Sequence, residues 1–130
     1  MANTIRPATA LGRAGEAFAA RLYTSRGGIV LARNVSYPVG ELDLVVREPD
    51  GTIVFVEVKT RSTAHFGTAE AVTPRKLARM RRAAARWLSG SASLKDVRFD
   101  VVALTARPDG APGSHTFDVD IFTGVEHGAQ

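Results

Sequence analysis

The sequence predicts a mixed α/β domain in which helices pack on the faces of one central sheet. Two segments, near residues 11–26 and 74–88, have apolar residues at helical spacing, and short runs rich in Val, Ile, Leu and Phe lie between and after them. The predicted order is helix, three strands, helix and strand, with one more strand near the C-terminus. No internal repeat or domain boundary is visible, so we expect residues 1–130 to form a single domain with flexible tails at 1–10 and 124–130.

The composition excludes several classes of protein. The chain has no Cys, which excludes disulfides, thiolate metal sites and a Cys nucleophile, and its three His are too far apart in sequence to suggest a His-rich zinc site. It has neither a run of about 18 apolar residues nor the apolar core of a signal peptide. We therefore expect a cytoplasmic protein with no membrane partner. The net charge of +4, carried mainly by Arg, favours a polyanionic partner without establishing one.

The first helix is predicted over Leu11–Arg26 and ends at Gly27-Gly28. Its buried stripe is predicted to consist of Ala14, Phe18 and Leu22. Glu16 lies roughly opposite that stripe and shares a face with Ala20 and Tyr23. The residues alone leave two interpretations of Glu16 open: an exposed first-turn acid favoured by the helix dipole, or an acid that reaches the site described next.

The hairpin after the strand Ile29–Val35 and the loop Ser36–Gly40 is the feature on which the functional prediction depends. Two apolar runs, Gly40–Val46 and Ile53–Arg61, flank a Pro-Asp-Gly turn. A two-residue loop would set Asp43 opposite Val56. A three-residue loop, ending in Gly51 in the left-handed region, would instead set Asp43 opposite Glu57, with Cβ atoms about 4.5–5.5 Å apart. We predict the three-residue loop.

Charged residues inside these apolar strands indicate chemistry. Two carboxylates as close as those of Asp43 and Glu57 repel, and one is protonated unless a cation lies between them. Mg²⁺ suits such a site, and Lys59, two residues beyond Glu57 on the same face, could orient or deprotonate a water or hold a phosphate oxygen. This arrangement is typical of a metal-dependent phosphodiesterase. The alternative is an edge hairpin whose polar face meets solvent, with Glu57 and Lys59 as a surface pair.

The second helix is predicted over Pro74–Leu88, with Thr73 as its N-cap. Its predicted buried stripe is Leu77, Met80, Ala84, Trp87 and Leu88, and the opposite side carries Arg75, Arg79, Arg82 and Arg86. No acid is interleaved with these Arg residues, and Arg75 and Lys76 lie in the first turn, where the helix dipole disfavours cations. An anion would relieve that conflict, so we predict that part of this helix faces phosphate. The alternative is a solvated charged face.

The remaining segments carry weaker signals. The loop 62–71 contains His65, which either contacts a substrate or lies on a plain surface loop. The strand Val97–Leu104 contains Asp100, either a further ligand or a structural acid. A Pro- and Gly-rich turn at 107–114 precedes Thr116–Phe122, whose alternation predicts a half-buried edge strand.

With these residues in place, the chain resembles the PD-(D/E)XK, or restriction-endonuclease-like, fold, and more closely the YraN family of uncharacterised, predicted endonucleases. The matching stretches are Gly12-Arg13-Ala14-Gly15-Glu16, Arg33-Asn34, Gly40-Glu41-Leu42-Asp43-Leu44, Phe55-Val56-Glu57-Val58-Lys59-Thr60-Arg61, Gly67, Lys76 and Arg98-Phe99-Asp100-Val101-Val102. The resemblance implies an αβββαβ core whose central mixed sheet is flanked by helices. Asp43 follows Leu42 rather than the Pro of the motif's name, a position that the chemistry does not need.

The resemblance also implies an activity and its residues. It implies a hydrolase, a Mg²⁺- or Mn²⁺-dependent endonuclease acting on DNA, including branched or recombination intermediates. Its implied metal ligands are Glu16, Asp43, Glu57 and the carbonyl of Val58, and its implied catalytic residues are Asp43, Glu57 and Lys59. We expect neighbouring phosphates to be bound by Arg61, Arg75, Lys76 and Arg79. A branched substrate would call for a homodimer. The alternative function is a catalytically silent module that binds nucleic acid or protein.

Overall fold

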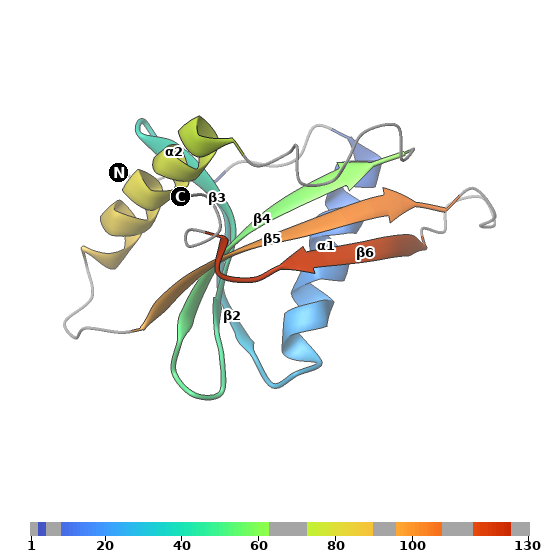
Figure 1. Ribbon diagram of the computed structural model, residues 1–130, viewed down its shortest axis with the longest axis horizontal. Coiled ribbons are helices and arrows are strands. Elements are labelled where there is room, and N and C mark those ends of the chain that lie inside the picture. Colours follow the sequence, from blue (N-terminus) through green and yellow to red (C-terminus); the bar gives the residue numbers. More distant parts are fainter. Residues whose placement is uncertain (1–2, 5–8, 63–72, 90–95, 108–115, 126–130) are drawn as a thin grey trace.

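The computed structural model describes residues 3–4, 9–62, 73–89, 96–107 and 116–125, and it contains two helices and a six-stranded sheet in that part of the chain (Figure 1). In chain order, the elements are β1 (Asn3–Thr4), α1 (Ala10–Thr24), β2 (Ile29–Tyr37), β3 (Gly40–Arg47), β4 (Ile53–Arg61), α2 (Pro74–Leu88), β5 (Val97–Ala106) and β6 (Phe117–Phe122).

The strands lie side by side in the order of the sequence, β1 to β6. All neighbours are antiparallel except β4 and β5, which are parallel and are joined by the segment containing α2. The two helices cover opposite faces, because separate buried clusters form between α1 and one face and between α2 and the other. This arrangement confirms the predicted α/β class, and the order αβββαβ is that of a restriction-endonuclease-like core.

The β3–β4 hairpin has the predicted register. Gly51 has φ +93°, and its N–H donates to the carbonyl of Glu48, while the N–H of Glu48 donates to the carbonyl of Thr52. The ladder pairs Leu44 with Val56, so the next residues on each strand, Asp43 and Glu57, are opposite one another. The hairpin lies between β2 and β5 in the sheet, so the edge-hairpin alternative is wrong.

The alternation of side chains along β3 is interrupted at Asp43. Leu42 and Val45 both pack in the cluster beneath α2, whereas Leu44 packs beneath α1. On the neighbouring strand, Asn34 has φ +50°, and the flanking pairs place it opposite Asp43. The sheet is therefore distorted at the predicted site, and strict period-2 alternation does not describe this stretch.

The predicted stripe of α1 packs against the core, but it lies at the edge of the buried face rather than at its centre. The buried residues of this helix are Gly15, Ala19, Ala20 and Tyr23. The three predicted residues, Ala14, Phe18 and Leu22, are only partly buried. The helix is rotated because small residues allow it to approach the sheet closely and because the Tyr23 hydroxyl has a partner inside. This rotation turns the side of the helix that carries Glu16 toward the sheet.

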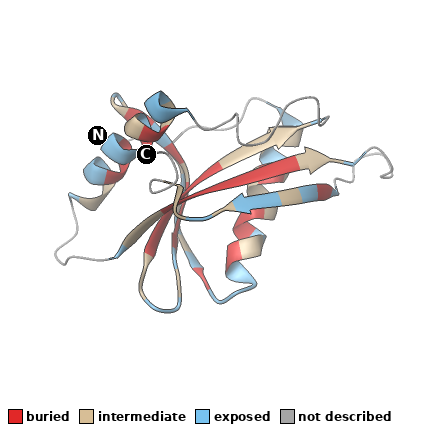
Figure 2. Cartoon of the chain, in the orientation of Figure 1, coloured by how far each residue is buried: buried red, intermediate tan, exposed pale blue. Residues whose placement is uncertain are grey.

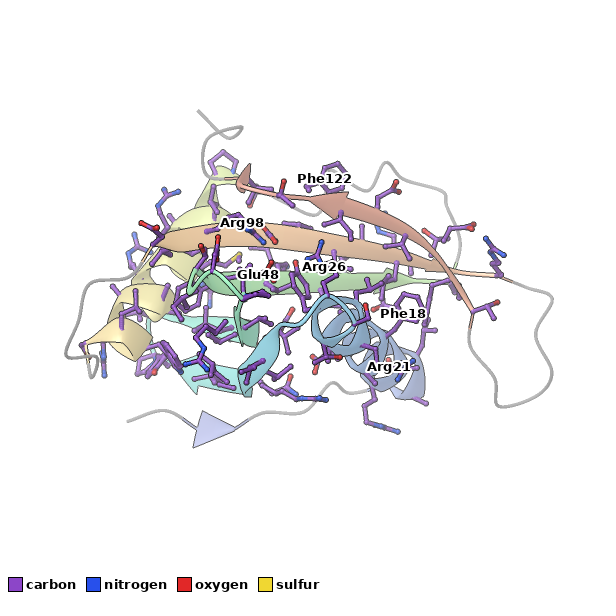
Figure 3. The ribbon with its side chains drawn as sticks, turned by 90° about the horizontal axis from the view of Figure 1, so that it is seen from below. Phe18, Arg21, Arg26, Glu48, Arg98 and Phe122 are labelled. Carbon is purple, nitrogen blue, oxygen red and sulfur yellow. The ribbon has the colours of Figure 1, made fainter. Side chains whose placement is uncertain are left out.

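That partner is Asp100, which is fully buried and serves a structural role. Its carboxylate accepts a hydrogen bond from the Tyr23 hydroxyl at 2.8 Å and two from the Arg98 guanidinium at 2.9 and 3.0 Å. The Gly124 N–H donates to it at 3.2 Å. Figure 3 shows Arg98 beside Glu48, whose carboxylate lies 4.0 Å from it. This network joins α1, β5, the hairpin turn and the C-terminal segment, and Asp100 itself pairs with Val56 on β4.

The second helix has the predicted bounds and cap. The Lys76 N–H donates to the Thr73 hydroxyl at 3.0 Å. Leu77, Met80 and Ala84 are buried as predicted, while Trp87 and Leu88 are only partly buried. Ala83, which was not predicted, is also buried. The outer face of the helix is exposed (Figure 2) and carries Arg75, Arg79, Arg82 and Arg86. Its cations are therefore available to a ligand.

Several boundaries differ from the prediction. Strand β2 continues to Tyr37, which leaves only Pro38 and Val39 as a turn before β3. Strand β1 lies inside the predicted flexible tail 1–10 and pairs with β2. Strand β6 lies at the sheet edge and is half-buried, as predicted. The predictions for His65, for residues 108–114 of the predicted turn 107–114 and for residues 126–130 concern residues outside the described part. Neither described helix is long and apolar enough to cross a membrane.

Candidate active site

The candidate site lies where the sheet divides. The β3–β4 ladder ends at the Leu44–Val56 pair, beyond which β3 pairs with β2 as far as Gly40, and β4 pairs with β5 as far as Arg61. Figure 1 shows the two halves of the sheet separating at this level, with α2 beside one of them. Side chains at such a fork have free space around them although both strands are interior to the sheet.

Asp43 lies on the β3 side of this fork. Its Oδ2 accepts a hydrogen bond from the Val58 N–H at 2.9 Å, which joins the two strands beyond the end of their ladder. Burial and the negative charge of Glu57 together raise the pKa of Asp43 to about 8, although the Val58 hydrogen bond opposes both. Asp43 and Glu57 are therefore close enough to interact strongly, as the hairpin register predicted.

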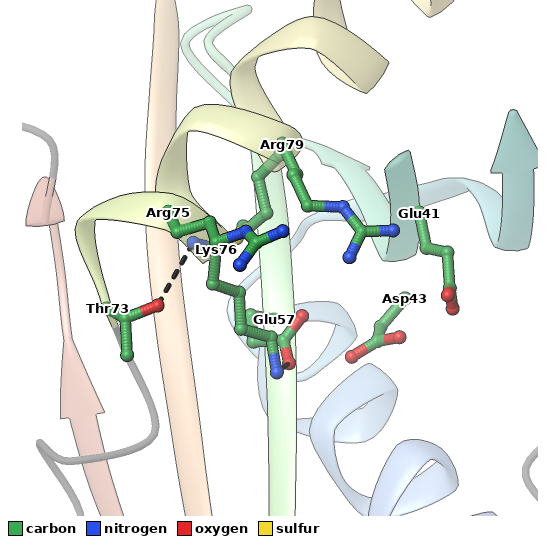
Figure 4. Close-up of a pocket in the computed structure, with 8 residues that line it drawn as sticks. Glu41, Asp43, Glu57, Thr73, Arg75, Lys76 and Arg79 are labelled. Atoms are coloured by element: carbon green, nitrogen blue, oxygen red, sulfur yellow. Dashed lines mark hydrogen bonds and ion pairs between the residues drawn. The ribbon is translucent and has the colours of Figure 1, made fainter. Parts of the chain in front are cut away.

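Glu57 lies across the fork on β4 and is only 8% exposed. Its Oε2 is 2.5 Å from the ammonium of Lys76, which projects from the first turn of α2. Sequence reasoning assigned Lys76 to a phosphate, and the structure places its ammonium on Glu57. Figure 4 shows this pair below α2, with Asp43 beside it on β3.

Two cavities meet at these carboxylates. The one on the α2 side has a volume of about 480 Å³ and is lined by Glu41, Asp43, Glu57, Thr73, Arg75, Lys76, Arg79 and Met80. The one on the α1 side has a volume of about 350 Å³ and is lined by Gly12, Glu16, Asn34, Glu41, Asp43, Glu57, Val58, Lys59, Thr60 and Lys76. The fork is thus open on both sides, with acids at its centre and cations around it.

Glu16 reaches the α1-side cavity from the second turn of its helix. Burial raises its pKa, the hydrogen bond with the Asn34 side chain and the charge of Arg33 oppose this, and Glu57 raises it. Because α1 begins at Ala10 and has no acid in its first turn, the interpretation of Glu16 as an exposed first-turn acid is wrong. The structure brings Glu16 to the site.

The other predicted residues are distributed around the fork. Lys59 lines the α1-side cavity, and Arg75 and Arg79 line the α2-side cavity. Arg61 lies farther along β4, opposite Thr105, and is not among the residues lining these two cavities.

Sequence reasoning did not assign Asn34 or Glu41 to the site. Glu41 shares the predicted face of Asp43, a signal that could have identified it. Asn34 gave only a weaker signal, as a residue type that tolerates positive φ inside a strand.

Glycines allow both helices to lie close to the fork. A Cβ on Gly15 of α1 would lie 2.1 Å from the Thr60 hydroxyl oxygen on β4, and a Cβ on Gly40 of β3 would lie 2.4 Å from the Arg79 carbonyl oxygen on α2. Neither contact is sterically possible, so only glycine permits these approaches. The first approach brings Glu16, the residue after Gly15, to the carboxylates. The second brings Lys76, one helical turn before Arg79, to the same place.

A family model described as "Uncharacterised protein family UPF0102" matches residues 15–104, a range that contains every charged residue of the fork named above. The chain belongs to this family. It is 51% identical to a UPF0102 protein of Corynebacterium efficiens over 120 residues, which cover 92% of this chain and 94% of that protein. A UPF0102 protein of Corynebacterium diphtheriae is 46% identical over 115 residues (88% and 89% of the two chains). One of Frankia alni is 49% identical over 108 residues (82% and 89%).

The fork of this UPF0102 protein offers a donor set that suits a hard divalent cation. In the described residues, no three His, Cys, Asp or Glu side chains are grouped closely enough to hold a metal ion. Mg²⁺, however, commonly takes one or two carboxylates and keeps several waters, which Asp43 and Glu57 could supply with solvent. The pKa of Asp43 is raised because its carboxylate is buried and is repelled by Glu57, and a bound cation would remove that repulsion. The residues therefore fit a two-carboxylate site, with Glu16 outside that pair.

Proposed function

We propose that this UPF0102 protein is a Mg²⁺- or Mn²⁺-dependent endonuclease that hydrolyses phosphodiester bonds in DNA, including branched intermediates, in keeping with its resemblance to the YraN family and the PD-(D/E)XK fold. The observation that carries the proposal is the convergence of Asp43 and Glu57 at the fork of the sheet, where burial and mutual repulsion raise the pKa of Asp43 to about 8. Maintaining such a conflict destabilises a fold, and functional sites are where proteins keep one.

The acidic residues of the fork and Lys59 have distinct roles in this proposal. Asp43 and Glu57 would hold the ion, with the Val58 carbonyl and Glu16 as the further ligands that the resemblance implies. The bound ion would polarise the phosphate and lower the pKa of the attacking water. Lys59 positions that water and offsets negative charge on the phosphate as the bond breaks.

A basic groove supports a nucleic acid as the substrate. A third cavity, of about 590 Å³, is lined by Pro38, Val39, Arg75, Ala78, Arg79 and Arg82. Arg75 and Arg79 also line the α2-side cavity of the fork, so the two spaces are adjacent. Farther along the helix, the Arg86 guanidinium lies 5.4 Å from the centre of the Tyr37 ring. A phosphate backbone that follows α2 from the fork would meet a row of cations and would be bound without base recognition.

A cleavage assay tests the proposal. Purified protein is incubated with linear DNA, four-way-junction DNA and RNA, with Mg²⁺, with Mn²⁺ or with chelator. We expect products only with a metal, and we expect Glu57→Ala and Lys59→Ala to abolish them. Asp120→Ala, an exposed change on the edge strand β6, is the matched control and should cleave normally. Products formed in chelator, or by both site variants, would refute the proposed mechanism.

The Lys76–Glu57 pair favours one alternative function. The ammonium of Lys76 neutralises Glu57 without a metal. A module that binds nucleic acid or protein without cleaving it would need no metal at this site. Such a module would bind DNA equally well in chelator and after Glu57→Ala, and would give no products from any substrate.

If the protein is a nuclease, cutting both strands of a branched substrate would require a homodimer, which sedimentation in the presence of junction DNA would detect.

A further inference from the structure

We infer that Lys76 is an exchangeable counter-ion: its ammonium neutralises Glu57 in the metal-free protein, and a divalent cation displaces it toward a phosphate of the bound nucleic acid. This inference rests on the proposed function, since it supposes that the fork binds a metal. It assigns to α2 a positioning residue in addition to Lys59 on the strand.

The first step of the argument is the need of Glu57 for a cation. Its side chain is 11% exposed and lies beside the carboxylate of Asp43. A buried carboxylate without a partner is strongly destabilising, and Lys76 meets this need at 2.5 Å. The ammonium therefore occupies the position in which a metal would neutralise the same oxygen.

The second step is that Lys76 is free to leave. Its side chain is 39% exposed and is joined to the helix by a flexible four-carbon stem. An ammonium and a divalent ion on one carboxylate repel one another, so each lowers the affinity of the other. Metal binding must then either release Lys76 from Glu57 or be weakened by the repulsion between the two cations.

The third step is the place to which Lys76 moves. It shares the α2-side cavity with Arg75 and Arg79, which project from the same helix (Figure 4). When the metal neutralises the carboxylates, three cations from α2 face one space, and a phosphate group is the anion that suits it. Metal and phosphate binding would therefore strengthen one another, and by thermodynamic linkage the effect is reciprocal.

The test measures Mn²⁺ affinity of the full chain by electron paramagnetic resonance in the absence of nucleic acid. Lys76→Met keeps the length of the stem and removes the competing charge, so we expect Mn²⁺ to bind about tenfold more tightly than to the wild type. Arg81→Met is the matched control: it removes one exposed charge from the same helix, outside the lining of the cavities described, and should leave the affinity unchanged.

A second measurement covers the event that Lys76→Met folds poorly without metal. Mn²⁺ should then raise the Tm of Lys76→Met, and of the milder Lys76→Gln, by more than it raises that of the wild type. Equal or weaker Mn²⁺ binding by Lys76→Met, together with normal binding by the wild type, would overturn this inference alone. Failure of all variants to bind Mn²⁺ would overturn the proposed function and this inference together.

Discussion

Replacing Asp43 by Asn should stabilise the metal-free protein at neutral and alkaline pH, although it removes a proposed ligand. The Asn side chain keeps an oxygen that can accept the hydrogen bond from Val58, and it removes a charge that is both buried and repelled by Glu57. Stabilisation on loss of a carboxylate would be the signature of a site kept for function at a cost in stability.

The sign and size of the effect follow from linkage. The pKa of Asp43 in the folded state, about 8, is above its ordinary value of 3.8, so between these pH values the folded state binds a proton that the unfolded state has lost. Stability of the wild type therefore falls as pH rises from about 4 to about 8 and then levels off. Each pKa unit corresponds to about 1.4 kcal/mol, and allowing for relaxation of the site we expect the variant to gain about 2–4 kcal/mol at pH 8.5.

Urea unfolding in chelator at several pH values between 4 and 8.5 measures this difference. The gain of Asp43→Asn over the wild type should be smallest at pH 4 and should grow toward pH 8.5. Asp120→Asn, an exposed change on β6, is the control and should shift stability little at any pH. Added Mg²⁺ should stabilise the wild type and leave Asp43→Asn unchanged. Destabilisation by Asp43→Asn at pH 8.5, or a difference independent of pH, would refute the reasoning.

Three further predictions concern the surroundings of the site. Gly40→Ala places a Cβ against the Arg79 carbonyl, so urea unfolding should show a loss of about 1–3 kcal/mol. Mn²⁺ affinity should rise, because α2 moves away and takes with it Lys76, the cation that competes with the metal for Glu57. Tyr23→Phe removes a hydrogen-bond donor from the buried Asp100, so it should cost about 1–3 kcal/mol while Mn²⁺ affinity is unchanged. Arg82→Glu should weaken DNA binding measured by fluorescence anisotropy, while turnover of saturating substrate is retained. The slope of log affinity against log salt concentration should become shallower by about one to two, because fewer counter-ions are released on binding.

Contrary outcomes would each exclude a specific contact. Unchanged stability of Gly40→Ala would mean that α2 does not lie against β3 as described. Altered Mn²⁺ affinity in Tyr23→Phe would mean that the Asp100 network is coupled to the fork. Normal DNA affinity in Arg82→Glu would mean that nucleic acid does not follow α2.

Local signals were sufficient for the elements that carry the two carboxylates. The turn ending in Gly51 fixed the register of the hairpin, and with it the pairing of Asp43 with Glu57, because a three-residue loop permits one alignment of its strands. The start of α2 likewise followed from Thr73 and the Pro after it, since capping depends on neighbouring residues.

Tertiary structure alone decided which way α1 faces and where Lys76 points. The rotation of α1 depends on Tyr23 reaching Asp100, which is 77 residues away in sequence. The position of the Lys76 ammonium depends on a carboxylate from another element, and on the close approach that Gly40 allows. Helical periodicity gives the residues on each face, whereas partners distant in the sequence decide which face is buried and which charges meet.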